Sequence, residues 1–233
     1  GIFLVATELN EAPELRTVVI SGHTRVDGLS NVVIDHDRAA RLALTHLKEL
    51  GHRRIALFRG QPGSSDTEVR SRAIFKAATS LGLKIPPELT LQLSGEGEDE
   101  VFTPDAAYQE GYAFGQKLLA RKVIFTALFA FDDASAIGAI RAFLDAGLRV
   151  PDDVSVVGFD DIQNAAYYNP RLTTVRQPLR EMGSIAARLL LERINTHEKK
   201  SDSFVVVDPE LIVRDSTGPA PLAKATSKSR AKK

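Results

Sequence analysis

Two patterns alternate along the amino-acid sequence, and this alternation limits the possible folds more than any other feature. Short apolar runs of strand length lie at residues 2–6, 17–20, 55–58, 127–131 and 154–159. Helical patterns follow several of them, with Asp37 and Asp133 as expected caps and Gly51, Gly82 and Gly147 as expected ends. Alternating strands and helices predict an α/β fold with parallel sheets and right-handed crossovers.

The charge balance and the residue types that are missing exclude several classes of protein. Thirty Lys and Arg residues balance thirty Asp and Glu residues. Because of this neutrality, we do not expect the chain to bind the phosphate backbone of a nucleic acid over a broad surface. The sequence contains no cysteine, which excludes disulfides, cysteine-bound zinc and thiol catalysis. The longest apolar runs are too short to cross a bilayer, so no membrane partner is predicted.

Familiar enzyme motifs are also missing. The chain has no glycine-rich dinucleotide fingerprint, no phosphate-binding loop, no nucleophile elbow and no His-Glu-x-x-His helix. The histidines lack the spacing of metal ligands; they are His23, His36, His46, His52 and His197. Adjacent carboxylates at 132/133 and 160/161 point in different directions, which disfavours acid–base catalysis. We therefore predict no enzymatic activity, no cofactor and no metal.

Both ends of the chain carry information about its context. Residues 218–233 are rich in Lys and Arg and poor in apolar side chains, so we predict a disordered basic tail; contact with nucleic acid is the alternative. Only two strands precede the helix at Asp37, too few for a covered parallel sheet. We expect the native polypeptide to continue upstream of Gly1. The absence of cysteine fits a cytoplasmic protein.

Polar side chains follow the predicted strands, where open α/β sheets bind ligands. We expect a binding site formed by Thr7, Ser21, Asp132, Asp160 and Gln177, together with Arg72 as a bidentate donor. Carboxylates that accept hydrogen bonds from neighbouring hydroxyls suit a neutral polyhydroxy ligand. Simpler roles remain open: turn bonding for the two aspartates, a surface ion pair for the arginine and backbone contacts for the glutamine. Helix capping is the favoured role of Asp133.

Several stretches in the expected order resemble the lactose-repressor (LacI/GalR) family of bacterial transcription regulators. They are residues 50–56 (LGHRRIA), 130–138 (AFDDASAIG), 150–161 (VPDDVSVVGFDD), 172–178 (LTTVRQP) and 209–217 (PELIVRDST). The most specific is 150–161, and together the matches extend from Gly1 to about Thr217. The chain is identified on these stretches as resembling the family's effector-binding domain.

The resemblance implies two Rossmann-like lobes with parallel sheets, of the periplasmic-binding-protein-like type I, with an incomplete N-terminal lobe. The expected N-terminal lobe is 1–35 plus 178–201, and the C-terminal lobe is 36–177 plus 202–217. By resemblance, Arg72, Asp132, Asp160 and Gln177 contact an effector or line the cleft, with Thr7 and Ser21 near it. Asp132 replaces the commoner Asn, which favours a ligand rich in donors. The family's aromatic cleft residue corresponds to Phe102 or Tyr108.

The implied function is allosteric sensing of a sugar or small metabolite. The effector would control operator DNA binding by a helix-turn-helix domain that is absent here, in a homodimer. A periplasmic sugar-binding protein of a transporter is the alternative, and a hydrolase on the same scaffold is a weaker one. A helix-turn-helix upstream predicts the repressor, whereas a secretory signal predicts the carrier.

Overall fold

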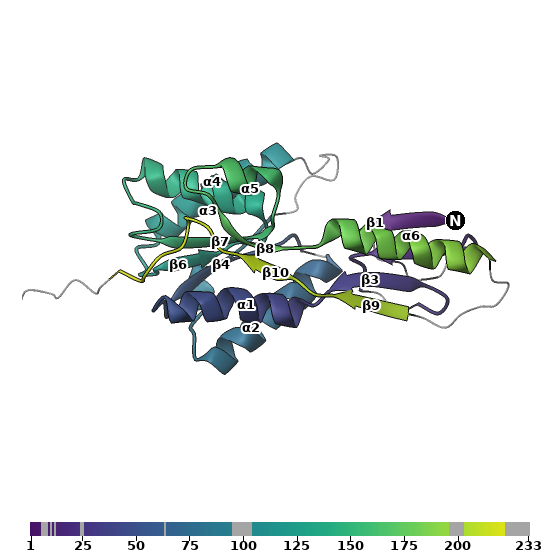
Figure 1. The fold of residues 1–233 in the computed structure, drawn as a ribbon. Coiled ribbons are helices and arrows are strands. Elements are labelled where there is room, and N and C mark those ends of the chain that lie inside the picture. The colour runs from purple at the N-terminus through teal and green to yellow at the C-terminus, as the bar shows by residue number, and fades with distance from the viewer. Residues whose placement is uncertain are drawn as a thin grey trace, which may run out of the picture.

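The computed structural model describes residues 1–5, 9, 11, 13–23, 26–62, 64–94, 104–195 and 203–221. These residues form two lobes that lie end to end, each with its own sheet (Figure 1). The predicted α/β class is confirmed, because all but one of the strand pairs in the two sheets are parallel. Among the described helices, none has the length and apolar character needed to span a membrane.

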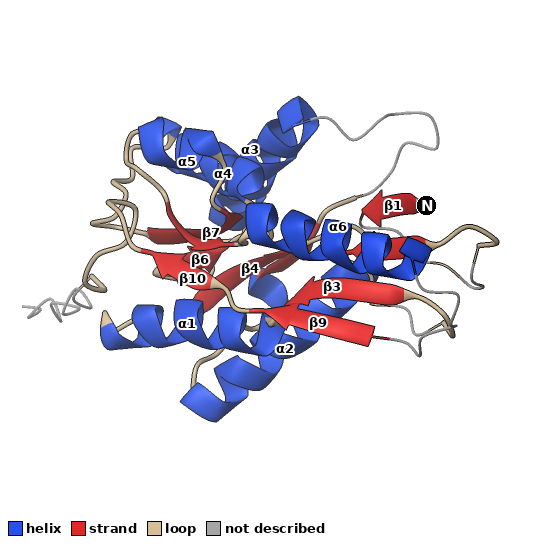
Figure 2. Cartoon of the chain, turned by 45° about the vertical axis from the view of Figure 1, so that its right-hand side comes forward, coloured by secondary structure: helices blue, strands red, loops and turns tan. Residues whose placement is uncertain are grey.

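The large lobe contains a six-stranded sheet in the order β10-β8-β7-β6-β4-β5, in which β10 alone is antiparallel to its neighbour. Its strands are β4 (Ile55–Arg59), β5 (Thr90–Gln92), β6 (Ala127–Phe129), β7 (Ser155–Asp160), β8 (Thr173–Arg176) and β10 (Glu210–Ile212). Helices cover both faces of this sheet (Figure 2). One face carries α1 (His36–Glu49) and α2 (Ser65–Leu81), and the other carries α3 (Pro104–Ala120), α4 (Asp133–Asp145) and α5 (Gln163–Tyr167).

Each face of the large sheet has its own core, because successive side chains of a strand point to opposite faces. In β4, Ala56 and Phe58 pack in the core beneath α3 and α4, whereas Ile55 and Leu57 pack in the core beneath α1 and α2. Burial on both faces explains why the strands appear in the sequence as continuous apolar runs rather than alternating ones. A short 3-10 helix, Pro87–Leu89, leads into β5.

The small lobe contains a four-stranded parallel sheet in the order β1-β2-β3-β9. Its elements are β1 (Ile2–Val5), β2 (Thr17–Ile20), β3 (Ser30–Ile34), β9 (Ser203–Val207) and the helix α6 (Leu179–Asn195). Val18 and Val32 pack against Met182, Ala186 and Leu190 of α6 to form its core. The helix therefore belongs to this lobe, although it follows β8 of the large one.

Within the described residues the chain passes between the lobes three times, at 34–36, 176–179 and 207–210. Two crossings are joined directly, because the Asp35 amide donates to the carbonyl of Val207 at 3.0 Å. Asp35 also caps α1, since its carboxylate accepts from the amide of Arg38 at 2.8 Å. The expectation that Asp37 caps this helix was wrong by two residues.

The predicted assignment of 202–217 to the C-terminal lobe is wrong for β9, which pairs with β3 of the small sheet over five residues, Ser203–Val207. Only β10 joins the large sheet. A β-branched run such as 205–207 predicts a strand but not its partner.

The predicted tail also begins too early, because its first residues pack against the large lobe. Gly218 bonds to Ser155 and His52, and the amide of Ala220 donates to Leu50 at 2.7 Å. Residues 222–233 lie outside the described part of the chain.

Candidate functional site

The carboxyl ends of β7 and β8 bring two of the predicted ligand residues together. Gln177 Nε2 donates to Asp160 Oδ1 at 2.5 Å. Asp160 has φ of 110°, a conformation that non-glycine residues rarely adopt and that is concentrated at functional sites. The backbone at this strand end is therefore held in a costly conformation that aims the carboxylate toward the glutamine.

This pair lines a hollow between the lobes of about 650 Å³, which we call the interlobe hollow. One wall comes from the strand ends of the large lobe, and the other comes from the first turns of α6, which packs on the small sheet. The lining residues are Asp160, Asp161, Arg176, Gln177, Pro178, Leu179, Arg180, Glu181 and Ser184. A ligand held here contacts both lobes.

A buried arginine lies near Asp160, and it is not the predicted one. Arg70 is 4% exposed, and its guanidinium carbon lies 4.2 Å and 3.7 Å from the ring centroids of Phe131 and Phe159. Its Nη1 donates to the carbonyl of Phe131 at 2.6 Å, and its Nη2 donates to Asp66 Oδ2 at 2.5 Å. Cation–π attraction to the two rings stabilises a guanidinium that is shielded from water.

Arg72, which the sequence pattern favoured, has an exposed side chain on the same helix. Successive helical residues are rotated by about 100°, so positions two apart point to nearly opposite sides of α2. The expectation that Arg72 joins this site is therefore corrected in favour of Arg70.

The electrostatics of the site centre on Asp160. Burial raises the pKa of its carboxyl to about 6, although the Arg70 guanidinium and the hydrogen bond from Gln177 act in the opposite direction. The nearby carboxylates of Asp132 and Asp66 raise it further. A desolvated carboxylate of this kind gains much from a ligand that donates hydrogen bonds to it.

The adjacent aspartates after β6 have exchanged their expected roles. Asp132 caps α4, because its Oδ1 accepts from the amide of Ser135 at 2.7 Å. Asp133, the expected cap, is fully buried and accepts from Thr174 Oγ1 at 2.5 Å and the amide of Ile162 at 2.8 Å. Burial raises the pKa of Asp133 to about 7. It joins α4 to β8 and the start of α5.

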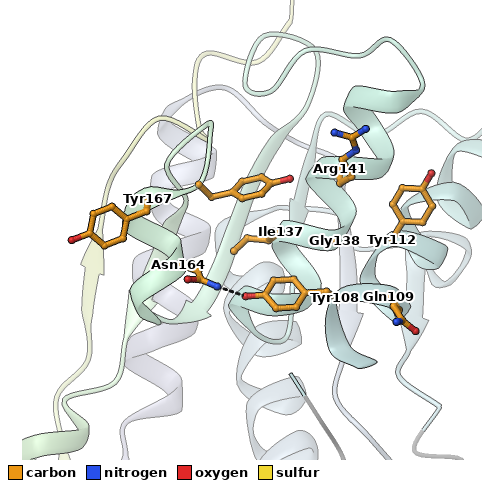
Figure 3. A pocket seen from close by; sticks show the side chains of 9 residues that line it. Tyr108, Gln109, Tyr112, Ile137, Gly138, Arg141, Asn164 and Tyr167 are labelled. Atoms are coloured by element: carbon orange, nitrogen blue, oxygen red, sulfur yellow. Dashed lines mark hydrogen bonds between the residues drawn. The ribbon is translucent and has the colours of Figure 1, made fainter. Parts of the chain in front are cut away.

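The remaining predicted residues lie apart from this pair or outside the described chain. Ser21 follows β2 with φ of 57°, is half-buried, and its amide donates to Val32 at 2.9 Å. Thr7 and Phe102 lie outside the described residues. Tyr108 lies in α3 rather than in a cleft loop, and its hydroxyl accepts from Asn164 Nδ2 at 2.9 Å (Figure 3). The expectation that Tyr108 is a cleft aromatic is therefore corrected.

Tyr108 instead lines a second hollow of about 630 Å³ between α3, α4 and α5. All four tyrosines of the chain line it, with Gln109, Ile137, Gly138, Arg141 and Asn164. We call this the tyrosine surface. Tyr167 is 79% exposed and points away from the other labelled side chains (Figure 3).

Similarity to proteins of assigned function agrees with this geometry. Residues 44–217 match the family described as periplasmic binding protein-like domain. The transcriptional repressor PurR of Pasteurella multocida is 35% identical over 190 residues, which are 80% of this chain and 53% of that protein. PurR of Aliivibrio fischeri is 32% identical over 224 residues, which are 93% and 64%. This chain therefore spans between half and two thirds of the length of these relatives.

Solved structures give the same result. A LacI-family regulator of Enterococcus faecium with bound ribose has a TM-score of 0.72 at 30% identity, over 87% of this chain and 70% of that one. The regulator CelR with cellobiose gives 0.73 at 32%, over 86% and 58%. A dimeric Lac repressor gives 0.76 at 26%, over 88% and 70%. The chain belongs to the LacI/GalR family. Its relatives are transcriptional regulators, which favours the regulator over the transport protein.

The sequence did not predict a site role for four polar residues of this LacI/GalR domain, namely His23, His36, Asp66 and Arg70. The spacing of Asp66 and Arg70 is the i,i+4 spacing of a helical ion pair and was a usable signal. Nothing local distinguished the two histidines, because their shared partner, Asp66, is 43 and 30 residues away in the sequence.

Proposed function

We propose that this LacI/GalR domain senses a small polar effector in the interlobe hollow. The observation that carries the proposal is the Asp160–Gln177 pair, which lines that hollow together with the first turns of α6. A ligand bonded to Asp160 on the large lobe and to Arg180 or Ser184 on the small lobe favours one relative orientation of the lobes. Such differential binding is what an allosteric response requires.

The chemistry of the hollow favours a donor-rich effector, with a sugar as the leading class. Asp160 offers oxygens only, and Gln177 offers both an acceptor and donors. Sugar hydroxyls donate and accept, so they satisfy both side chains at once. Two of the similar regulators were solved with ribose and with cellobiose, which supports this class.

We further propose that the parent protein is a repressor that binds operator DNA as a homodimer. The repressor relatives extend well beyond the segment matched here, and one similar structure is a dimeric Lac repressor. The effector would then alter the relative orientation of paired DNA-binding domains.

Calorimetric titration with ribose, with cellobiose and, as a comparison that is not a sugar, with the nucleobase adenine tests the effector site. One of the two sugars should bind, and Asp160→Asn and Gln177→Ala should each weaken binding roughly ten- to a hundredfold, because each loses a hydrogen bond to a charged group or ligand hydroxyl. Arg72→Ala is the matched control and should bind like the wild type, since its side chain is exposed. Equal affinity in all four proteins contradicts the site, and binding of adenine alone contradicts the sugar class.

A further inference from the structure

A second group of polar side chains lies between the lobes, outside the interlobe hollow. His23 follows β2 of the small lobe, His36 begins α1, and Asp66 lies in the first turn of α2. His23 Nε2 lies 3.1 Å from Asp66 Oδ1, and His36 Nε2 lies 3.0 Å from the same oxygen. One ligand atom from each residue lies within 4.8 Å of the other two. Three separate segments thus converge on one point.

These distances fit the edges of a metal coordination sphere. A tetrahedral Zn²⁺ ion with bonds of about 2.0–2.1 Å to imidazole nitrogen and carboxylate oxygen requires neighbouring ligand atoms roughly 3.3 Å apart. Both histidine contacts to Asp66 are within a few tenths of an ångström of that value. The ligand atoms of the two histidines lie within 4.8 Å of each other, so an ion is admitted when one imidazole rotates toward the other.

The types of the three side chains also suit a metal. Zn²⁺ binds imidazole nitrogen and carboxylate oxygen, and sites of this ion are built from such groups. His36 is 4% exposed, so its ring is held in place by the surrounding side chains. Asp66 Oδ1 lies within hydrogen-bond distance of both imidazoles.

Arg70 orients the carboxylate as outer-shell partners of metal ligands do. Its Nη2 holds Asp66 Oδ2, which leaves Oδ1 directed at the two imidazoles.

We propose that His23, His36 and Asp66 form a binding site for a divalent transition-metal ion of the Zn²⁺ type, with water as the fourth ligand. The ion joins the segment after β2 of the small lobe to α1 and α2 of the large lobe, so it restrains the lobe orientation. The spacing of the histidines in the sequence did not indicate this site, because its ligands meet only in the folded chain. The proposal does not depend on the identity of the effector.

Titration of the whole chain with Co²⁺ tests the site, because tetrahedral Co²⁺ with nitrogen and oxygen ligands absorbs visible light strongly. We expect one equivalent of Co²⁺ to bind, Zn²⁺ to displace it, and Zn²⁺ to raise the midpoint temperature of unfolding until a chelator is added. His23→Ala should lose the absorption and the thermal shift, and it is the preferred variant because His23 is less buried than His36.

His46→Ala is the matched control, since His46 lies at the other end of α1 and bonds to Thr217. It should bind Co²⁺ like the wild type. Circular dichroism establishes that both variants fold, and Asp66→Asn provides a second variant that should also lose the ion. Wild-type protein without the Co²⁺ bands overturns the proposal, as does unchanged stoichiometry in folded His23→Ala or folded Asp66→Asn.

Discussion

Neighbouring residues of one type take different roles at three points in this molecule, and the partners that each side chain meets separate them. Arg70 lies between two aromatic rings, whereas Arg72 is exposed. Asp160 meets Gln177, whereas Asp161 is held by Arg176 at 2.7 Å and Arg214 at 2.6 Å. Asp132 and Asp133 divide in the same way between capping and a buried contact. The direction in which a side chain points is therefore a better guide to its function here than its residue type.

The pKa of Asp160 predicts how effector binding depends on pH. Its folded-state pKa is raised to about 6, so the carboxyl is protonated below that pH and ionised above it. A ligand that donates to the carboxylate should bind with constant affinity above about pH 7, and the affinity should fall towards tenfold per pH unit below about pH 6. Calorimetry from pH 5 to 8 measures this, and Asp160→Asn should remove the dependence on this group. A wild-type affinity that rises as the pH falls contradicts the assignment.

At the scale of elements, small residues decide how closely the helices approach. A Cβ added to Gly138 of α4 would lie 2.1 Å from the carbonyl oxygen of Tyr108, and one added to Gly111 of α3 would lie 2.2 Å from that of Ser135. Both clashes are with helix backbone, which cannot move aside without separating the helices. The α3–α4 contact therefore requires glycine on each side.

Two glycine substitutions should consequently change stability in opposite directions. Gly138→Ala should destabilise the chain by about 1–3 kcal/mol, because it overpacks the α3–α4 contact. Gly183→Ala in α6 should stabilise it by about 0.5–1 kcal/mol, because no atom lies within 4 Å of the new methyl group and alanine is the better helix former. Urea unfolding of both variants measures this difference. Equal free energies of unfolding contradict the packing of α3 on α4.

At the scale of the whole molecule, three chain crossings join two lobes that have separate cores. The bond between Asp35 and Val207 ties two of the crossings together, while the interlobe hollow lies beside the third, at Gln177. Movement of one lobe against the other therefore changes the distance across the hollow. This arrangement allows a bound effector to change the relative orientation of the two lobes.

The tyrosine surface is the candidate dimer interface. Tyrosine is enriched at protein interfaces, and Tyr167 is 79% exposed at the edge of an apolar hollow. Tyr167→Asp should shift the chain toward monomer, measured by sedimentation equilibrium, without loss of its fold. Ile124→Asp is the matched control, since Ile124 is 77% exposed outside that surface. A dimer that persists in Tyr167→Asp and dissociates in Ile124→Asp contradicts this choice of surface.

The sequence by itself determined what depends on local pattern. Apolar runs predicted central strands of the large sheet, such as β4 and β7. Such strands are buried on both faces, so their sequences are continuous runs of apolar residues. The rule that ligands bind beyond strand ends predicted Asp160 and Gln177, which the fold brings within hydrogen-bond distance. The stretch 150–161 also identified the family.

Only the tertiary structure decided what depends on partners distant along the chain. Strand pattern does not specify a neighbour, so the pairing of β9 with β3 was not readable. Helix pattern without the surrounding fold did not separate Arg70 from Arg72. The meeting of His23, His36 and Asp66 depends on three segments that are brought together only when both lobes have formed. Contacts between residues distant in sequence leave no local periodicity, and these are the contacts that make the site.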